Sequence, residues 1–331
     1  MSSPAANPLV SVQVRSIRIE ADGVRSFELR PDKGTSLPAA QAGSHIDVHI
    51  PGGLVRQYSI TNPGEHQCYV IGVNLDAKSR GGSQHMHEKL QVGDRLQISA
   101  PRNHFQLNEQ ASLSVLIAGG IGITPLLAMV RRLLSLDLAF VLYYCARSRD
   151  RAAFVDELGG LVRDVPKARL ETVFDDEAGV ASLDLSAVIE RHPGAHFYCC
   201  GPAPLLDAFV SASSVIDPEH VHVEYFAGAS AASGTPAGQD ATSSAFKVRL
   251  ARSNIEVEVL PHVSILDALA NRGVSVLNSC REGICGSCET AVLEGTPDHR
   301  DRVLSPSERA ANNTMMVCVS RCHGASLLLD L

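Results

Sequence analysis

The first third of the chain alternates between apolar and polar residues in short runs. The alternation covers residues 12–19, 26–29 and 43–50, and glycine or proline separates these runs. Alternation with a period of two places one face of a strand against a core and the other face toward solvent. Short strands with frequent turns therefore predict an antiparallel β-barrel for residues 1–110.

A different pattern begins at residue 111. Residues 114–118 form an unbroken apolar run, which is typical of a strand inside a parallel sheet, and apolar residues at helical spacing follow over 126–136. Further strands are predicted at 140–144, 169–173, 196–200 and 221–225, and further helices at 152–158 and 203–213. This alternation predicts an α/β domain with a parallel sheet for residues 111–227, in which ligands bind at the carboxyl ends of the strands.

The remaining residues divide into a linker and a third domain. Residues 228–244 are small and polar without periodicity, so they are predicted to form a flexible linker. Two strands and a helix capped by Ser264 are predicted between residues 246 and 272. Residues 245–331 are therefore expected to form a small α+β domain of the β-grasp type.

Composition and charge exclude several classes of protein. The 331 residues are 45% hydrophobic and 20% charged, as in ordinary globular proteins, and the net charge of -7 argues against a nucleic-acid partner. Glycines and a proline interrupt the most apolar run, residues 115–130, so no membrane span is expected. The first residues do not resemble a signal peptide. Nine cysteines without such a signal indicate a reducing compartment, so we expect a cytoplasmic protein.

Four cysteines in the third domain carry the most specific chemical signal. Cys280, Cys285, Cys288 and Cys318 follow the spacing C-x4-C-x2-C-x29-C, which is typical of plant-type ferredoxins with a 2Fe-2S cluster. Each iron takes four sulfur ligands. Because two bridging sulfides supply half of them, the protein must supply two cysteines for each iron.

Two alternatives stay open for these cysteines. A structural zinc site usually pairs two C-x2-C motifs, whereas this stretch has one, formed by Cys285 and Cys288. Cys322 competes with Cys318 for the place of fourth ligand. Cys318 is preferred because it lies in a short apolar run, residues 315–319, that can hold it rigidly.

A candidate phosphate site lies in the predicted barrel. Gly81, Gly82 and Ser83 precede a short helix predicted at 84–90, and Ser83 is its expected N-cap. Free backbone N–H groups at a helix N-terminus, together with a serine hydroxyl, suit a single phosphate group. Arg56 supplies a guanidinium for the same phosphate.

Two neighbours of Arg56 extend this candidate site. Tyr58 offers a ring against a flat cofactor, and Ser59 offers a hydrogen bond to the polar edge of that cofactor. The alternative is that Arg-x-Tyr-Ser on a strand is simply a pair of interacting surface residues without a ligand, which is common. The nearby phosphate loop and the cysteine motif downstream favour the functional interpretation.

A second glycine-rich turn follows the strand at 114–118. Gly119, Gly120 and Gly122 let the backbone approach a pyrophosphate, although they do not match the G-x-G-x-x-G fingerprint. Thr124 is the expected cap of the helix that follows. The turn therefore predicts a dinucleotide site, although a glycine-rich turn after a strand is only a moderately specific motif.

A third candidate turn follows the strand at 196–200. Gly201 and Pro202 come directly after Cys200, and Gly201 leaves room for a ring. Cys200 is predicted to pack its polarisable sulfur against a nicotinamide. The alternative is that Cys199 and Cys200 are both small buried hydrophobic residues. Neither is expected to act as a nucleophile.

Together these motifs resemble the phthalate dioxygenase reductase family, which includes vanillate O-demethylase reductases and other class IA reductases of Rieske oxygenases. The resemblance covers nearly the whole chain and includes the order of the three domains. It implies FMN, NADH and a 2Fe-2S cluster as cofactors, and a monomer that serves a terminal Rieske oxygenase. The resemblance places FMN at Arg56, Tyr58, Ser59, Gly81, Gly82 and Ser83. It places NADH at Gly119, Gly120, Gly122, Thr124, Cys200, Gly201 and Pro202, with Phe226 near the flavin.

Electron counting is consistent with this resemblance. NADH gives two electrons at once as a hydride, whereas a 2Fe-2S cluster accepts one, so a flavin has to stand between them. Three alternatives stay open. They are an FAD-containing reductase for another acceptor, a redox-sensing 2Fe-2S protein without sustained turnover, and a zinc-stabilised interaction protein.

Overall fold

The computed structural model describes residues 9–76, 81–177, 182–226 and 244–331. The chain divides into two compact units, Met1–Phe226 and Ala227–Leu331. Apart from Ser244, the linker predicted at 228–244 lies outside the described residues. No helix in the described part of the chain is long and apolar enough to cross a membrane.

An antiparallel barrel forms the first part of the first unit, as predicted. Its strands follow the order β4-β3-β6-β1-β2-β5, and an isolated bridge between Ile60 and Ile71 joins the two edges. Alternate side chains, among them Val12, Val14 and Phe27, point into a buried core. The elements are β1 (Val10–Ala21), β2 (Val24–Pro31), β3 (His45–Ile50), β4 (Leu54–Ser59), β5 (Tyr69–Asn74), α1 (Gly82–Glu88) and β6 (Arg95–Ile98).

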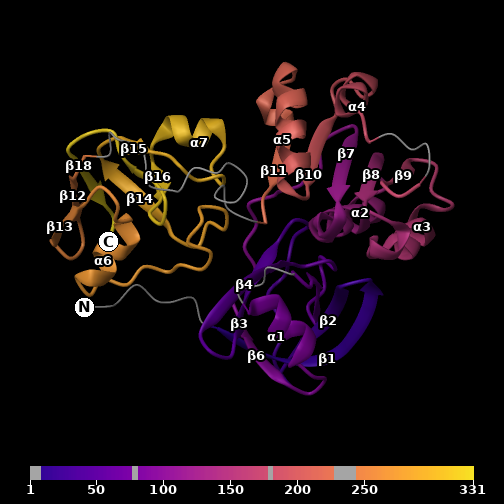
Figure 1. The fold of residues 1–331 in the computed structure, drawn as a ribbon, viewed down its shortest axis with the longest axis horizontal. Helices are drawn as coiled ribbons and strands as arrows, with labels where there is room; N and C mark the ends of the chain where they lie inside the picture. The colour runs from indigo at the N-terminus through magenta and orange to yellow at the C-terminus, as the bar shows by residue number, and fades with distance from the viewer. Residues whose placement is uncertain (1–8, 77–80, 178–181, 227–243) are drawn as a thin grey trace. The chain divides into compact units, whose positions relative to one another are not determined.

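A parallel five-stranded sheet forms the rest of the first unit, also as predicted. Its strands follow the order β11-β10-β7-β8-β9. Helices α2 and α3 cover one face, and α4 and α5 cover the other (Figure 1). The elements are β7 (Ser114–Gly119), α2 (Ile123–Ser135), β8 (Phe140–Ala146), α3 (Val155–Val162), β9 (Ala168–Phe174), α4 (Leu185–Arg191), β10 (His196–Cys200), α5 (Ala203–Ala212) and β11 (Val221–Glu224).

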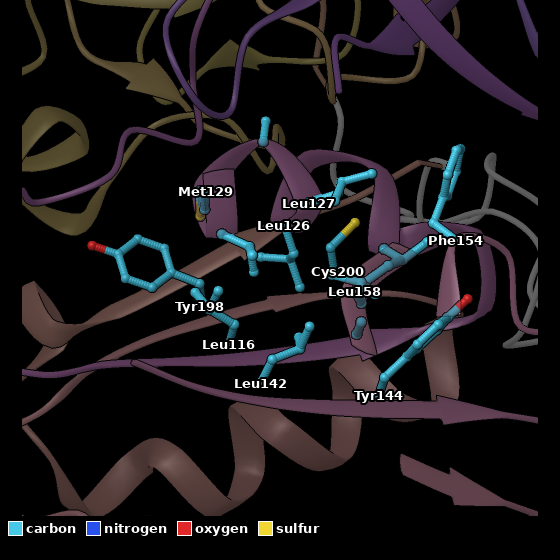
Figure 2. Packing of buried hydrophobic residues seen from close by; sticks show 14 of the residues in the cluster. Leu116, Leu126, Leu127, Met129, Leu142, Tyr144, Phe154, Leu158, Tyr198 and Cys200 are labelled. Carbon is cyan, nitrogen blue, oxygen red and sulfur yellow. The ribbon is translucent and has the colours of Figure 1, made fainter. Parts of the chain in front are cut away.

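The barrel and the parallel sheet share a hydrophobic core. Figure 2 shows the buried cluster beneath α2, in which Cys200 lies among leucine and aromatic side chains. Val24, Ala42 and Phe105 of the barrel belong to the same cluster. Arg131 of α2 also donates a hydrogen bond to the carbonyl of Thr61 (2.7 Å). This continuous packing explains why the two parts form one compact unit.

Two helices begin at different residues from those predicted. Helix α1 starts at Gly82 with Gly81 as its N-cap, so Ser83 is not the cap, and its hydroxyl instead accepts the N–H of Asp76 (3.2 Å). Helix α2 starts at Ile123 with Gly122 as its N-cap, so Thr124 is not the cap either. At α1 the glycine cap has no side chain to occupy the N–H groups of the first turn, and among the described residues these groups are left for a ligand. At α2 the N–H of Ile123 already donates to the carbonyls of Gly120 and Ile121.

The second unit has the mixed sheet expected for a β-grasp domain. Its main sheet follows the order β13-β12-β18-β14-β16, and β15 pairs with β17 in a small ribbon. Ser264 caps α6 as predicted, because its hydroxyl accepts the N–H of Asp267 (3.0 Å). The elements are β12 (Phe246–Leu250), β13 (Glu256–Val259), α6 (Ile265–Asn271), β14 (Glu289–Glu294), β15 (Pro297–Asp298), α7 (Pro306–Ala311), β16 (Thr314–Met316), β17 (Arg321–Cys322) and β18 (Ser326–Leu329).

Candidate electron-transfer sites

The predicted phosphate site is a cradle between strand β4 and helix α1. A Cβ atom added to Gly82 would lie 2.6 Å from Nε of Arg56, so only glycine lets the guanidinium lie against the start of the helix. Gly81 takes a left-handed conformation (φ 93°) that turns the chain into α1. A cation beside uncapped N–H groups suits a phosphate monoester. These residues therefore fit the phosphate end of FMN.

Strand β4 also carries the two other predicted flavin residues. The hydroxyl oxygen of Ser59 is buried and has no hydrogen-bond partner among the described residues. An orphaned buried hydroxyl is costly, and a polar ligand edge would satisfy it. Burial raises the pKa of Tyr58 to about 12, so its ring presents a neutral surface. Both observations fit a flat cofactor with polar edges.

The two nucleotide turns lie side by side because their strands, β7 and β10, are neighbours in the sheet. A Cβ atom on Gly122 would lie 2.2 Å from the carbonyl oxygen of Cys200, and one on Gly201 would lie 3.0 Å from Cα of Gly119. Backbone packs directly on backbone here, and Pro202 follows as the N-cap of α5. The predicted residues therefore meet at the carboxyl end of the sheet, where such folds bind nucleotides.

Cys200 is completely buried in this structure. Burial raises the pKa of its thiol well above the ordinary value, in agreement with the expectation that it is not a nucleophile. Its sulfur lies 4.0 Å from Oε2 of Glu224, on the adjacent strand β11. Contact with a nicotinamide ring remains a prediction for Cys200. Phe226, which the family resemblance places near the flavin, is 43% exposed at the end of this unit.

Glu224 is a candidate site residue that the sequence reasoning missed. Burial raises the pKa of its carboxyl to about 8, so the group is mostly neutral at pH 7. Glu224 lies beside Cys200 because the two residues are paired between the parallel strands β11 and β10. The available signal was a single carboxylate at the carboxyl end of a predicted strand in a nucleotide-binding sheet.

The raised pKa of Glu224 predicts a dependence of stability on pH. Between about pH 4.5 and pH 8 the unfolded chain ionises this group while the folded chain keeps the proton, so rising pH should destabilise the fold. The slope is on the order of 1.4 kcal/mol per pH unit at most. Glu224→Gln cannot ionise, so we expect it to raise the thermal midpoint of the first unit at pH 7.5 more than at pH 5.5.

Thermal unfolding of wild type and variant at the two pH values measures this effect. Glu190→Gln, on an exposed position of α4, is the matched control and should shift the midpoint equally at both values. Equal shifts for Glu224→Gln would show that its carboxyl is not held neutral by the fold.

The four predicted cluster cysteines form two pairs in the second unit. The side chains of Cys280 and Cys285 are hydrogen-bonded, as are those of Cys288 and Cys318. The hydrogen bond from Cys280 lowers the pKa of Cys285, and that from Cys288 lowers the pKa of Cys318. No group of three or more ligands suited to one metal ion lies within the described ranges. Two thiol pairs match the two irons of a 2Fe-2S cluster.

The loop that carries three of these cysteines is curled by left-handed residues. Arg281, Gly283 and Gly286 all have positive φ, at 59°, 70° and 70°. This curl turns N–H groups toward sulfur, and the N–H of Glu282 donates to Cys280 (3.2 Å). Such donors stabilise the charge of thiolate ligands. The donor set therefore fits an anionic iron–sulfur cluster.

Cys322 occupies a different environment from the two pairs. Its sulfur accepts the N–H of Gly324 (3.2 Å) and donates toward the carbonyl of Ser326 (3.6 Å). These local contacts favour Cys318 as the fourth ligand, and that assignment stays a prediction.

Two family models match parts of the chain. Residues 248–323 match the family model described as a 2Fe-2S iron-sulfur cluster binding domain, and residues 116–211 match the model of an oxidoreductase NAD-binding domain. The chain is 47% identical to the phenoxybenzoate dioxygenase subunit beta of Ectopseudomonas oleovorans, with all of both chains covered. It is 43% identical to the tetrachlorobenzoquinone reductase of Sphingobium chlorophenolicum, again over the full length of both.

A solved structure shows the same architecture. The structure described as phthalate dioxygenase reductase, a modular structure for electron transfer from pyridine nucleotides to [2Fe-2S], is 37% identical to this chain. The match covers 98% of each chain with a TM-score of 0.68. The fold and the matched domains thus define an NAD-dependent iron–sulfur oxidoreductase. Within that class, the chain belongs to the phthalate dioxygenase reductase family, as the sequence resemblance indicated.

Proposed function

We propose that this protein takes a hydride from NADH onto FMN and passes the electrons singly, through a 2Fe-2S cluster, to the Rieske centre of a terminal oxygenase. The carrying observation is that one chain holds a phosphate cradle and a nucleotide cradle in its first unit and two thiol pairs around a curled loop in its second unit. FMN, when bound, accepts two electrons together and releases them one at a time. Rieske centres lie well above plant-type clusters in potential, so the final step is downhill.

The residues of this chain bind and orient the reactants in this scheme. Arg56 and the first turn of α1 hold the phosphate of the flavin, and the hydroxyl of Ser59 satisfies a polar edge of its ring system. The turns after β7 and β10 hold the dinucleotide, with Gly201 leaving room for the nicotinamide. Neutral Glu224 beside Cys200 keeps negative charge out of this part of the site.

The identity of the dinucleotide is part of the proposal. Arg149 follows β8, and its guanidinium pairs with Asp156 (2.6 Å), whose negative charge opposes a 2′-phosphate at this position. The family also favours NADH. The nine cysteines form no disulfide in the described part of the chain, which suits a reducing compartment, so we place the reaction in the cytoplasm. From the family resemblance we infer that the protein acts as a monomer.

A different acceptor is the second candidate. The relative named tetrachlorobenzoquinone reductase, at 43% identity, points to a quinone that takes electrons directly. The two functions share the first steps and differ in the last one.

Analysis of the purified protein tests the proposal. We expect one FMN and two irons per chain, a red-brown colour, and NADH-driven reduction of both ferricyanide and cytochrome c, with NADPH clearly poorer by kcat/KM. Extracted FAD, bound zinc or a lack of sustained NADH turnover would contradict it. Rapid reduction of a halogenated benzoquinone, with no transfer to any Rieske protein, would favour the second candidate.

A further inference from the structure

A buried carboxylate lies behind the cluster loop in the second unit. The side chain of Asp301 is fully buried. Its Oδ2 accepts the N–H groups of Val303 (3.1 Å) and Leu304 (2.9 Å), and its Oδ1 accepts the hydroxyl of Ser320 (3.4 Å). The guanidinium of Arg309 lies 3.7 Å from Oδ2. Every one of these partners is a donor, so together they hold the carboxylate oxygens of Asp301 in a fixed position.

The turn that Asp301 organises is bonded to the cluster loop. The N–H of Arg302 donates to the carbonyl of Gly283 (2.8 Å). The two backbones are also in close contact, because a Cβ atom on Gly283 would lie 3.1 Å from Cα of Asp301 and 2.6 Å from Cγ2 of Val319. Gly283 is thus pressed between the Asp301 turn and the segment that carries Cys318.

The peptide of Gly283 joins the two pairs of cysteines. Its N–H donates to the sulfur of Cys318. Gly283 itself lies in the loop between Cys280 and Cys285. The position of one pair relative to the other therefore depends on how firmly the Asp301 turn holds this peptide.

We propose that Asp301 is a positioning residue for the cluster: it fixes the turn that holds Gly283 against Cys318, and its negative charge lowers the reduction potential of the cluster. A fixed anion opposes the addition of an electron, and charge and hydrogen bonds near the sulfurs are established determinants of such potentials. This inference rests on the proposed function, since it requires the cluster.

Asp301→Asn in the full-length protein tests the proposal, because it keeps the size of the side chain and removes its charge. We expect the variant to keep two irons per chain and to be easier to reduce, by about tenfold in the one-electron equilibrium constant, which corresponds to about 59 mV. The readout is a redox titration followed by the electron paramagnetic resonance signal of the reduced cluster.

Asp298→Asn is the matched control. Asp298 lies on β15 in the same unit, and the partners of its carboxylate among the described residues are Arg300 (2.7 Å) and His323 (3.8 Å) rather than the Asp301 turn. We expect its potential to stay close to that of wild type. Equal potentials for Asp301→Asn and Asp298→Asn would overturn the proposal.

Arg309→Gln keeps the proposal testable if Asp301→Asn fails to hold iron. Arg309 lies on the outer helix α7 and donates to the backbone carbonyls of Asp301 and Leu304 (3.1 Å to the latter). Removing the positive charge of Arg309 should lower the reduction potential of the cluster, the opposite of the change expected for Asp301→Asn. Arg300→Gln should leave that potential unchanged. If Arg309→Gln behaves like Arg300→Gln, the inference fails. Wild type without a reducible cluster would instead refute the proposed function.

Discussion

Serine in place of any one of the four predicted cluster cysteines is expected to remove the cluster, whereas Cys322→Ser is expected to keep it. The four are Cys280, Cys285, Cys288 and Cys318. Each thiol is one of a hydrogen-bonded pair, so a single replacement leaves one iron with an incomplete set of thiolates. A serine hydroxyl ionises far less readily than a thiol and is a poor substitute.

Iron and sulfide content, with the visible spectrum, measures the outcome. We expect the four variants to lose most of their iron and their cytochrome c reduction while keeping flavin and ferricyanide reduction, because the flavin site belongs to the other compact unit. Cys322→Ser is the control, since its sulfur bonds only to Gly324 and Ser326 among the interactions of the described residues. Loss of iron from Cys322→Ser alone would contradict the ligand assignment.

Gly122→Ala is expected to disable the nucleotide site. The added Cβ would lie 2.2 Å from the carbonyl oxygen and 2.4 Å from the carbonyl carbon of Cys200, and 2.7 Å from the nitrogen of Gly201. All three are backbone atoms, so no side chain can rotate away and the two turns must separate. Overpacking of this kind costs about 1–3 kcal/mol. A displacement of about 1 Å in a reacting geometry costs about 100-fold in rate.

Stopped-flow reduction of the flavin over a range of NADH concentrations measures this loss. Gly159→Ala is the matched control, because Gly159 lies in α3 with nothing near the added atom. Alanine in a helix is favoured over glycine by about 1 kcal/mol, so the control should be as active as wild type and no less stable. Normal flavin reduction in Gly122→Ala would show that NADH does not bind between these turns.

Local signals account for what the sequence predicted well. The spacing of the cysteines, the strand at Phe246–Leu250 and the helix capped by Ser264 each depend on a few neighbouring residues, and the structure shows both elements where expected. Strand β7 could be predicted because its residues form an unbroken apolar run, and the structure shows it fully buried.

Features that depend on distant residues could not be predicted in this way. Ser83 and Thr124 have good capping chemistry, but Gly81 and Gly122 take the N-cap positions. Gly81 does so in a left-handed conformation (φ 93°), and Gly122 packs directly on the backbone of Cys200. Glu224 gains its environment from pairing with β10, and the Asp301 turn gains its role from contact with Gly283. Both contacts join residues that are far apart in the sequence, so no short stretch of sequence could reveal them.

Strand β18 determines when the second unit can be completed during protein synthesis. It lies between β12 and β14, parallel to the first and antiparallel to the second, although it is made after every other strand of the sheet. Pairing strands that are far apart in sequence is slow, because the intervening loop must close first. The cysteine loop therefore leaves the ribosome before its supporting sheet can close, and iron can be installed in a finished site only after Ser326–Leu329 has emerged.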